Sequence, residues 1–281
     1  MTLPPPEMLP ALPDGGGLVF RADGGSAAAT RSWVPEVPVA LEFNGLSYAV
    51  MMASPTDLAD FASGFALSEG IATSADQITA ITPVEVEQGW IIRTQVAGLD
   101  AARLSERVRA RVAESSCGLC GIDNLAAIAR PLPPVRFHSR VEPAAIFAAL
   151  RALRGSQALG QATGAAHAAA LCDGSGAILG LREDVGRHNA MDKLIGAAAR
   201  AGLALGEGFV LSTARCSYEI VEKAVKAGAT SLVTISLPTS MAVARAAVAG
   251  LSLWVLARDD SVTLAHDGAL CVHPRALPPH P

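Results

Sequence analysis

The chain has 281 residues, of which 51% are hydrophobic and 17% charged, and its formal net charge is -4 at pH 7. This composition excludes an intrinsically disordered chain, because enough apolar surface is present to build one or two packed cores. The negative balance leaves no overall positive field to attract nucleic acid or an anionic membrane, so we expect neither as a partner.

The cysteines and the apolar stretches indicate where the protein works. Five cysteines are sparse for this length, and the Pro-rich residues 1–13 lack the basic and apolar parts of a secretory signal. The longest apolar stretch, residues 241–257, is interrupted by Arg245 and Gly250, which argues against a membrane span. We therefore expect a soluble protein in the reducing cytoplasm.

The first part of the chain reads as a tail followed by an α+β unit. Residues 1–30 are rich in proline and glycine, which predicts a disordered tail. Alternating segments around the Asn-Gly pair at 44–45 predict a β-hairpin, and Ser-Pro-Thr-Asp at 54–57 predicts a capping box that opens an amphipathic helix. Further predicted elements, which complete a unit over residues 31–135, are strands at 78–83, 84–87 and 90–96 and a helix at 101–114.

The second part, residues 136–281, alternates strands and helices. Helices are predicted at 143–154, 189–201, 218–227 and 240–248, and strands at 168–172, 177–181, 209–213, 232–236 and 251–256. Strands separated by single helices indicate a sheet with parallel members and helices on its faces. The predicted fold class is α/β, a mixed sheet flanked by helices, with a smaller N-terminal α+β part.

Cys117 and Cys120 form a C-x-x-C pair among glycines, which let the backbone bend and present a thiol. Three interpretations compete: sulfur chemistry of a thiolate, half of a zinc site, and a structural pair. A zinc site needs four ligands, and the chain has neither a second C-x-x-C nor the H-x-E of zinc deaminases, so we expect no metal. A Gly- and Ser-rich loop favours sulfur carriage over a redox pair at a helix start.

Polar residues gather where predicted strands end and helices begin, the edge at which parallel sheets bind ligands. The main loops are 182–193 and 212–219, and in the second a helix start with Arg215 could hold a phosphate. Loops 163–167 and 237–240 are weaker signals. Simpler explanations exist, since charge runs are often solvated helix ends, His188 alone is more often structural, and Ser217 could merely cap its helix.

Four motifs follow one another with definite spacing: Ser116 to Gly121 around the two cysteines, Thr163-Gly164 with His167, Asp184 to Lys193, and Arg215 with Ser217 and Glu219. Together they resemble the FdhD family of formate dehydrogenase accessory sulfurtransferases. The similarity runs from about residue 37 to residue 258, and the early helix motif at 54–70 also matches.

The resemblance implies a cytidine-deaminase-like core without the deaminase metal, in a cytoplasmic protein that is often a homodimer. It also implies a sulfurtransferase activity. The protein would accept persulfide sulfur from a cysteine desulfurase and pass it to the bis-molybdopterin guanine dinucleotide cofactor, with molybdenum or tungsten, for the catalytic subunit of formate dehydrogenase. The alternative is a chaperone that binds this cofactor without moving sulfur.

By the same resemblance, Cys117 carries the persulfide and Cys120 assists it. The cofactor, or GDP as a mimic of its guanine nucleotide, is expected near His167, Asp184, Arg187, His188, Asn189, Asp192, Arg215, Ser217, Glu219, Leu256, Ala257, Arg258, Asp259, Asp260 and Ser261. The chemistry agrees with this assignment, because the attacking group must be a thiolate and cationic neighbours raise the thiolate fraction.

Overall fold

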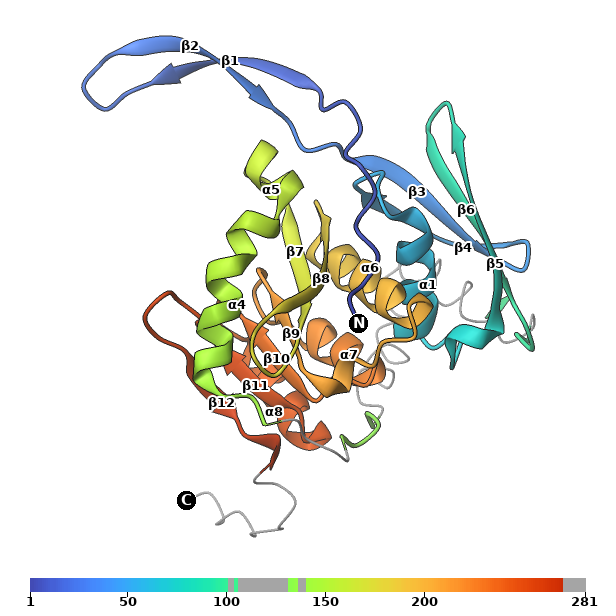
Figure 1. The fold of residues 1–281 in the computed structure, drawn as a ribbon. Coiled ribbons are helices and arrows are strands. Elements are labelled where there is room, and N and C mark those ends of the chain that lie inside the picture. The colour runs from blue at the N-terminus through green and yellow to red at the C-terminus, as the bar shows by residue number, and fades with distance from the viewer. Residues whose placement is uncertain (101–103, 106–130, 136–139, 270–281) are drawn as a thin grey trace, which may run out of the picture.

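The structure is a computed structural model, and it describes residues 1–100, 104–105, 131–135 and 140–269. Cys117, Cys120 and most of the helix predicted at 101–114 lie outside the described residues. Within the described residues the strands form three sheets, of two, four and six strands (Figure 1).

The four-stranded sheet comes from the first part of the chain, in the order β4-β3-β6-β5. Its elements are β3 (Val37–Phe43), β4 (Leu46–Ala53), α1 (Leu58–Ser68), the short helix η1 (Ala75–Gln77), β5 (Ile78–Val86) and β6 (Gly89–Val96). The predicted hairpin is confirmed, and Asn44 and Gly45 at its tip both have positive φ. The two strands predicted at 78–83 and 84–87 are one edge strand, β5, where Pro83 is tolerated.

Helix α1 packs on this sheet through aromatic rings. Phe65 lies between Phe43, with ring centroids 6.3 Å apart, and Tyr48, at 5.9 Å. Phe61 meets Phe65 edge-on at 6.2 Å and is fully buried. Burial of each such ring contributes about 1.5–3 kcal/mol, so this cluster fixes α1 against the sheet.

The six-stranded sheet comes from the second part, in the order β12-β11-β10-β9-β7-β8. Its elements are α4 (Pro143–Ser156), α5 (Ala158–Thr163), β7 (His167–Cys172), β8 (Ile178–Asp184), α6 (Arg187–Arg200), η2 (Leu205–Glu207), β9 (Phe209–Ser212), α7 (Tyr218–Lys226), β10 (Ser231–Thr234), α8 (Ser240–Ala249), β11 (Ser252–Val255) and β12 (Thr263–His266). Strands β9, β10 and β11 are parallel, whereas β7 and β12 run against their neighbours. The predicted fold class is confirmed.

Helices cover both faces of this sheet, as Figure 1 shows. Successive residues of a strand point to opposite faces. Ala169 and Leu171 of β7 accordingly pack with α6 and α7, whereas Ala168 and Ala170 pack with α4. No helix of the described residues is both long and apolar enough to cross a membrane.

Helices α1 and α6 join the two large sheets through a close backbone contact. A Cβ atom added at Gly64 would overlap the backbone carbonyl of Asp192, and one added at Gly196 would overlap that of Asp60. Only glycine allows the two helices to approach this closely. The pair therefore sets the distance between the two halves of the molecule.

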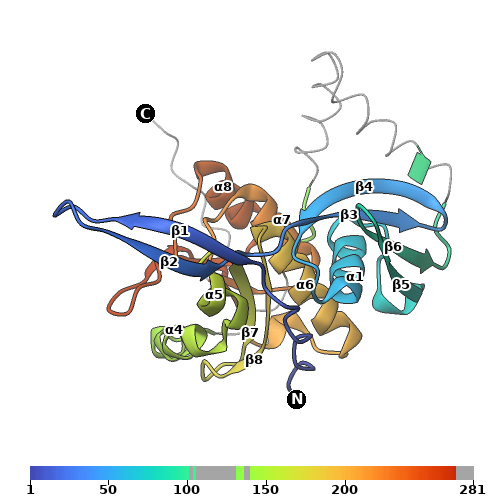
Figure 2. The ribbon, with the colours of Figure 1, turned by 90° about the horizontal axis from the view of Figure 1, so that it is seen from above.

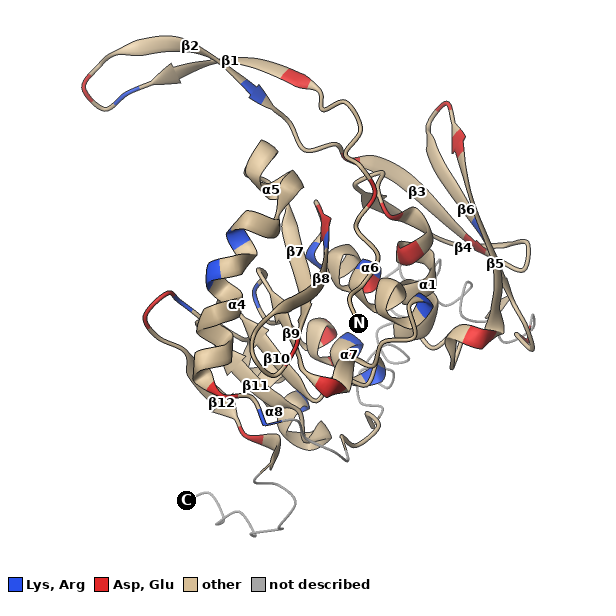
Figure 3. Ribbon diagram, in the orientation of Figure 1, with Lys and Arg blue, Asp and Glu red and all other residues tan. Residues whose placement is uncertain are grey.

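Charged residues lie on α1, α6 and α7 around the same contact (Figure 3). The ion pairs that cross or flank it are Arg182 with Asp60 at 2.8 Å, Lys193 with Asp184 at 2.7 Å, and Lys223 with Asp192 at 2.9 Å. Taking a charge out of water is costly unless a partner is held in place, so the Arg182–Asp60 pair couples the two halves directly. Lys193 and Lys223 also bond to Ser54 and Ser68 of the first half.

The N-terminal segment is ordered where the sequence predicts a disordered tail at 1–30. Leu3 is buried, its N–H donates to the carbonyl of Leu179 at 2.7 Å, and Glu7 exchanges two 2.8 Å hydrogen bonds with Asp57. Strands β1 (Asp14–Phe20) and β2 (Ser26–Ser32) then form a hairpin. Composition alone misses this order because its partners are distant in sequence.

The start of α1 also differs from the prediction, because the capping box expected at 54–57 is not formed. The helix begins at Leu58, and Asp57 before it has a φ of 52° and makes no side-chain cap. Ser54 Oγ instead accepts a hydrogen bond from the N–H of Val185 at 3.1 Å. The serine therefore links the first half of the chain to the end of β8.

Candidate functional site

The carboxyl ends of β8, β9, β10 and β11 meet at one edge of the six-stranded sheet, together with the start of β7. This follows from the pairing, since β8 and β9 both run against β7, and β10 and β11 run parallel to β9. The loops that start at residues 185, 213, 235 and 256 therefore gather there, as the sequence predicts. Ligands bind at this edge in open α/β sheets.

His167, Arg187 and His188 form a cationic group at this edge. His167 opens β7 and pairs with Asp184 in the ladder, while Arg187 and His188 open α6. Burial, and next the charge of Arg187, lower the pKa of both imidazoles. Both histidines are therefore neutral at neutral pH, and Arg187 supplies the positive charge of the group.

Glu219 in the first turn of α7 faces His188, with Oε2 at 3.5 Å from Nε2. This contact raises the pKa of His188 and partly offsets the effect of burial. Arg215 is exposed in the loop before α7. The starts of α6 and α7 thus carry two arginines, Arg187 and Arg215, and one partly exposed carboxylate, Glu219.

Two buried polar atoms at the edge, Arg187 Nε and Ser217 Oγ, make no hydrogen bond to any described residue. Within the described part of the chain, His188 Nε2 has only the 3.5 Å contact with Glu219. Ser217 is the N-cap residue of α7, yet its side chain does not cap the helix, so the simple structural explanation for it does not hold. Buried polar atoms normally have partners. Their grouping at two helix starts is what a bound anion would satisfy.

Asp184 and Asn189, predicted as cofactor contacts, turn inward. Asp184 accepts hydrogen bonds from Lys193, from the N–H groups of Ser54 and Gly186, and from Asn189 Nδ2 at 2.7–3.0 Å. Asn189 Nδ2 also donates to the carbonyl of Met52 at 2.8 Å. Both side chains are fully engaged within the protein, so they support the turn that presents Arg187 and His188.

Asp192 is likewise buried within the protein. It accepts from Ser68 Oγ at 2.7 Å and from Lys223 Nζ at 2.9 Å. Burial raises the pKa of Asp192, and Lys223 opposes the rise. Burial also lowers the pKa of Lys223, but Asp192 and Glu69 outweigh it and raise the pKa overall. Asp192 lies where α1, α6 and α7 meet, so it stabilises the packing of these helices behind the site and does not face a ligand.

The stretch 256–261, also predicted to meet the cofactor, lies beside the loop after β10. The N–H groups of Leu256 and Ala257 donate to the carbonyls of Ser236 and Thr234, and Arg258 Nη1 donates to that of Ile235 at 2.5 Å. Ala257 is buried, whereas Arg258 and the three residues after it, Asp259, Asp260 and Ser261, are exposed at the edge. Asp259 makes a solvent-exposed ion pair with Arg154 at 3.5 Å.

The cysteines of the described residues are poor nucleophiles. Burial raises the pKa of Cys172 and of Cys216 to about 12, so almost no thiolate exists at neutral pH. The predicted catalytic pair, Cys117 and Cys120, lies outside the described residues and its role stays a prediction.

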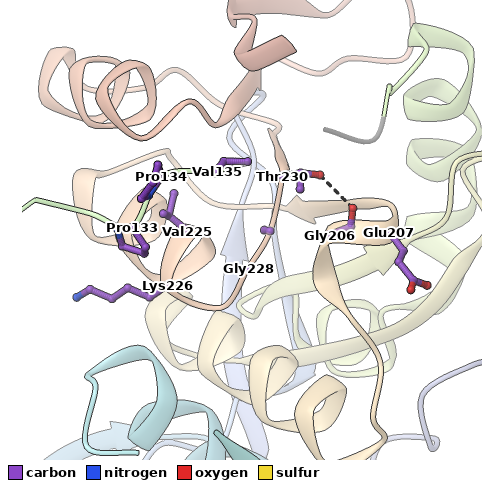
Figure 4. Close-up of a pocket in the computed structure, with 10 residues that line it drawn as sticks. Pro133, Pro134, Val135, Gly206, Glu207, Val225, Lys226, Gly228 and Thr230 are labelled. Atoms are coloured by element: carbon purple, nitrogen blue, oxygen red, sulfur yellow. Dashed lines mark hydrogen bonds between the residues drawn. The ribbon is translucent and has the colours of Figure 1, made fainter. Parts of the chain in front are cut away.

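A separate cavity of about 540 Å³ opens at the opposite edge of the sheet, before β9 and β10 (Figure 4). It is lined by Pro133, Pro134, Val135, Gly206, Glu207, Val225, Lys226, Gly228, Ala229 and Thr230. Thr230 Oγ1 donates to the carbonyl of Gly206 at 3.2 Å. Among the described residues, none of the predicted site residues lines the cavity.

Of the residues that support Asp184 and Asp192, sequence reasoning missed Ser54, Ser68 and Lys223, whereas Lys193 belongs to the predicted motif. Ser54, Ser68, Lys193 and Lys223 all contact Asp184 or Asp192. Lys193 stands in the charged run at 182–193, which was a usable signal. The other three lie in segments where nothing local points to the site.

Comparisons with known proteins identify the family of the chain. The model of the FdhD/NarQ family matches residues 34–268. The chain belongs to the FdhD/NarQ family. It is 45% identical over 235 residues to the sulfur carrier protein FdhD of Variovorax paradoxus, covering 83% of this chain and 84% of that protein.

Further members of the family are similar over most of the chain. The sulfur carrier protein FdhD of Bordetella petrii is 42% identical over 262 residues, 92% of each chain. A solved structure of a candidate formate dehydrogenase accessory protein from Desulfotalea psychrophila aligns with a TM-score of 0.72 at 22% identity, covering 91% of this chain and 97% of that one. This neighbour supports the fold of the family for this chain.

Proposed function

We propose that this protein is a cytoplasmic sulfur carrier, a sulfurtransferase that serves formate dehydrogenase. Its relatives in the FdhD/NarQ family are named sulfur carrier proteins, and one of them is 45% identical to it. In this proposal Cys117 accepts sulfur from a cysteine desulfurase and delivers it to the bis-molybdopterin guanine dinucleotide cofactor, with molybdenum or tungsten, of the dehydrogenase's catalytic subunit.

The observation that carries the cofactor part of the proposal is a pair of buried polar atoms at the sheet edge, Arg187 Nε and Ser217 Oγ, which make no hydrogen bond to a described residue. They lie at the starts of α6 and α7, where backbone N–H groups and the helix dipole favour an anion. Arg215 adds an exposed guanidinium suited to a phosphate. We assign the guanine nucleotide end of the cofactor, or GDP in its place, to this edge.

Loading of sulfur onto Cys117 is a thiol–persulfide exchange and needs no outside oxidant or reductant. The thiolate of Cys117 attacks the outer sulfur of the donor persulfide, the donor S–S bond breaks, and the donor cysteine leaves as a thiolate. Attack of Cys120 on the sulfur of Cys117 would then form a disulfide and release sulfide to the cofactor metal. A dithiol reductant then supplies the two electrons that reduce this disulfide before the next cycle.

The experiment combines the protein with a cysteine desulfurase and cysteine, and measures added sulfur on each cysteine by mass spectrometry. We expect sulfur on Cys117, its loss in Cys117→Ala, and its retention in the control Cys172→Ala, whose thiol has a pKa of about 12. Full maturation of formate dehydrogenase by Cys117→Ala would instead support the alternative, a chaperone that holds the cofactor without moving sulfur.

Dimerisation, implied by the family resemblance, stays a prediction at this point. It does not affect the sulfur step, which needs only one copy of Cys117.

A further inference from the structure

The hairpin of β1 and β2 extends away from both large sheets, as Figures 1 and 2 show. Its apolar side chains are exposed: Leu18 by 66%, Phe20 by 76% and Trp33, just after β2, by 54%. A two-stranded ribbon is marginally stable on its own and an open strand edge invites pairing. No described part of this chain buries these side chains, so we expect another surface to pack against them.

The outer edge of β1 carries free backbone groups at alternate residues. The N–H of Arg21 donates to Gly25 and that of Trp33 donates to Pro13, which fixes the hydrogen-bonded pairs of the β1–β2 ladder. By the alternation of an antiparallel ladder, Gly15, Gly17 and Val19 bond to β2. The backbone N–H and C=O groups of the alternate residues consequently point away from β2. These residues are Asp14, Gly16, Leu18 and Phe20.

The strand is self-complementary when laid against a reversed copy of itself. It reads, in order, as an acid (Asp14), three glycines (15–17), three large apolar residues (18–20) and then a base (Arg21). Antiparallel pairing sets the glycine block of one copy against the apolar block of the other, and the acidic end beside the basic end. Parallel pairing would instead bring the two acids together.

We propose that β1 pairs antiparallel with β1 of a second copy of this chain, about a two-fold axis at Gly17. This register overlaps the whole of both strands and pairs all four outward-facing residues, Asp14 with Phe20 and Gly16 with Leu18 of the other copy. Two-fold contacts of this kind are self-complementary and closed.

The side chains fit this register. The Leu18 and Phe20 side chains of both copies lie on one face, where Gly16 leaves room for them. On the other face Val19 lies opposite Gly15 of the second copy, whose Cβ position is occupied by the ring of Trp33. Each exposed apolar residue of the strand thereby gains a cover.

The sequence of the hairpin lacks three devices that often protect open edges: lysine, proline and a bulge. Residues 14–32 contain no lysine and no proline, and the β1–β2 register has no bulge. The charges are balanced, with Asp14 and Arg31 at the base and Arg21 and Asp23 at the tip (Figure 3). A second copy meets no net repulsion there.

A pair of cysteine variants tests the register. In an antiparallel pair without mutual hydrogen bonds the Cα atoms are about 4.5 Å apart, within disulfide range, and Gly17 meets its own copy in this way. Gly16 meets Leu18 instead. Both positions have open space around them, so a new side chain fits at either.

The full chain is prepared with Cys117, Cys120 and Cys271 changed to serine, carrying either Gly17→Cys or Gly16→Cys, and oxidised mildly. We expect Gly17→Cys to cross-link at least about tenfold faster than Gly16→Cys. Equal rates, or no cross-linking of Gly17→Cys at millimolar-range protein concentration, would overturn the proposed register.

Sedimentation equilibrium of the otherwise unchanged chain tests the surface itself. Leu18→Lys places two lysines across the two-fold axis and should raise the dimer dissociation constant at least about tenfold. Val248→Lys, an equally exposed apolar position on α8 at 75%, should leave it unchanged. If Leu18→Lys leaves the dimer dissociation constant unchanged, the dimer forms through another surface. If the unchanged chain is a monomer, β1 does not pair with a second copy. Either result refutes the proposal.

Discussion

Lys193 Nζ lies 2.7 Å from Oδ2 of Asp184, and neither side chain has any exposure to solvent. The ammonium also donates to the carbonyl of Ser54 at 3.0 Å. The pair therefore ties the strand end that carries the candidate site to the first half of the chain. Because both charges are dry, removing one leaves the other without compensation.

We predict that Lys193→Met lowers the free energy of unfolding by about 3–5 kcal/mol, since Asp184 is left as an unpaired buried charge. Urea denaturation followed by circular dichroism measures the change. Arg140→Ala is the matched control, because its ion pair with Glu142 is largely exposed and should contribute less than about 1 kcal/mol. Equal losses in the two variants would contradict the buried pair.

The helix contact at Gly196 gives a second prediction. Gly196→Ala should destabilise the protein by about 1–3 kcal/mol or more, because its methyl group would overlap the backbone of Asp60. Gly155→Ala near the end of α4 has open space and should stabilise by about 0.5–1 kcal/mol. Thermal unfolding of both variants provides the measurement, and a stable Gly196→Ala protein would rule out the close approach.

The histidines predict how stability depends on pH. Burial lowers the pKa of His188 below its ordinary value of 6.5, so the unfolded chain binds a proton more readily than the folded one. His188 therefore leaves the free energy of unfolding unaffected above pH 6.5. Below pH 6.5 it lowers that free energy progressively, until the pH reaches the lowered pKa of the folded state.

His188→Gln should weaken that dependence, while the stability of the variant relative to the native protein improves as the solution is acidified. Denaturation curves at several pH values between about 5 and 7 test this. An unchanged slope in the variant would mean that His188 is not the group responsible.

Arg215 gives a prediction about binding. Arg215→Ala should weaken the affinity for GDP at least about tenfold, because an exposed guanidinium at a helix start can make charge-assisted bonds to phosphate. Isothermal titration calorimetry measures the affinity. Arg151→Ala removes the same charge from the exposed face of α4 and should have no effect. If both variants bind GDP as the native chain does, the nucleotide is not held at this edge.

Local patterns in the sequence predicted the elements well. The hairpin at Asn44-Gly45 and the alternation of strands and helices after residue 136 depend on neighbouring residues, so the period of the pattern suffices. The edge that gathers the loops followed from strand order. Strand order does not tell which side chains at that edge face outward.

The reason is the distance in sequence between partners. Asp184 meets Ser54 across 130 residues and Asp192 meets Ser68 across 124. The order of the N-terminal segment has the same origin, because Leu3 bonds to Leu179. No local pattern predicts such pairs. The charged run at 182–193 resembles a ligand site, but several of its side chains instead make buried contacts within the protein.

The glycine contact between α1 and α6 has a consequence for how the protein is made. Gly64 leaves the ribosome well before Gly196, and at ordinary rates of translation the delay is roughly ten seconds. During that interval the nascent chain contains α1, which packs on its own sheet through aromatic rings, but α6, its partner helix, has not yet been synthesised. The first half of this protein must therefore wait, incompletely folded, for its second half to emerge.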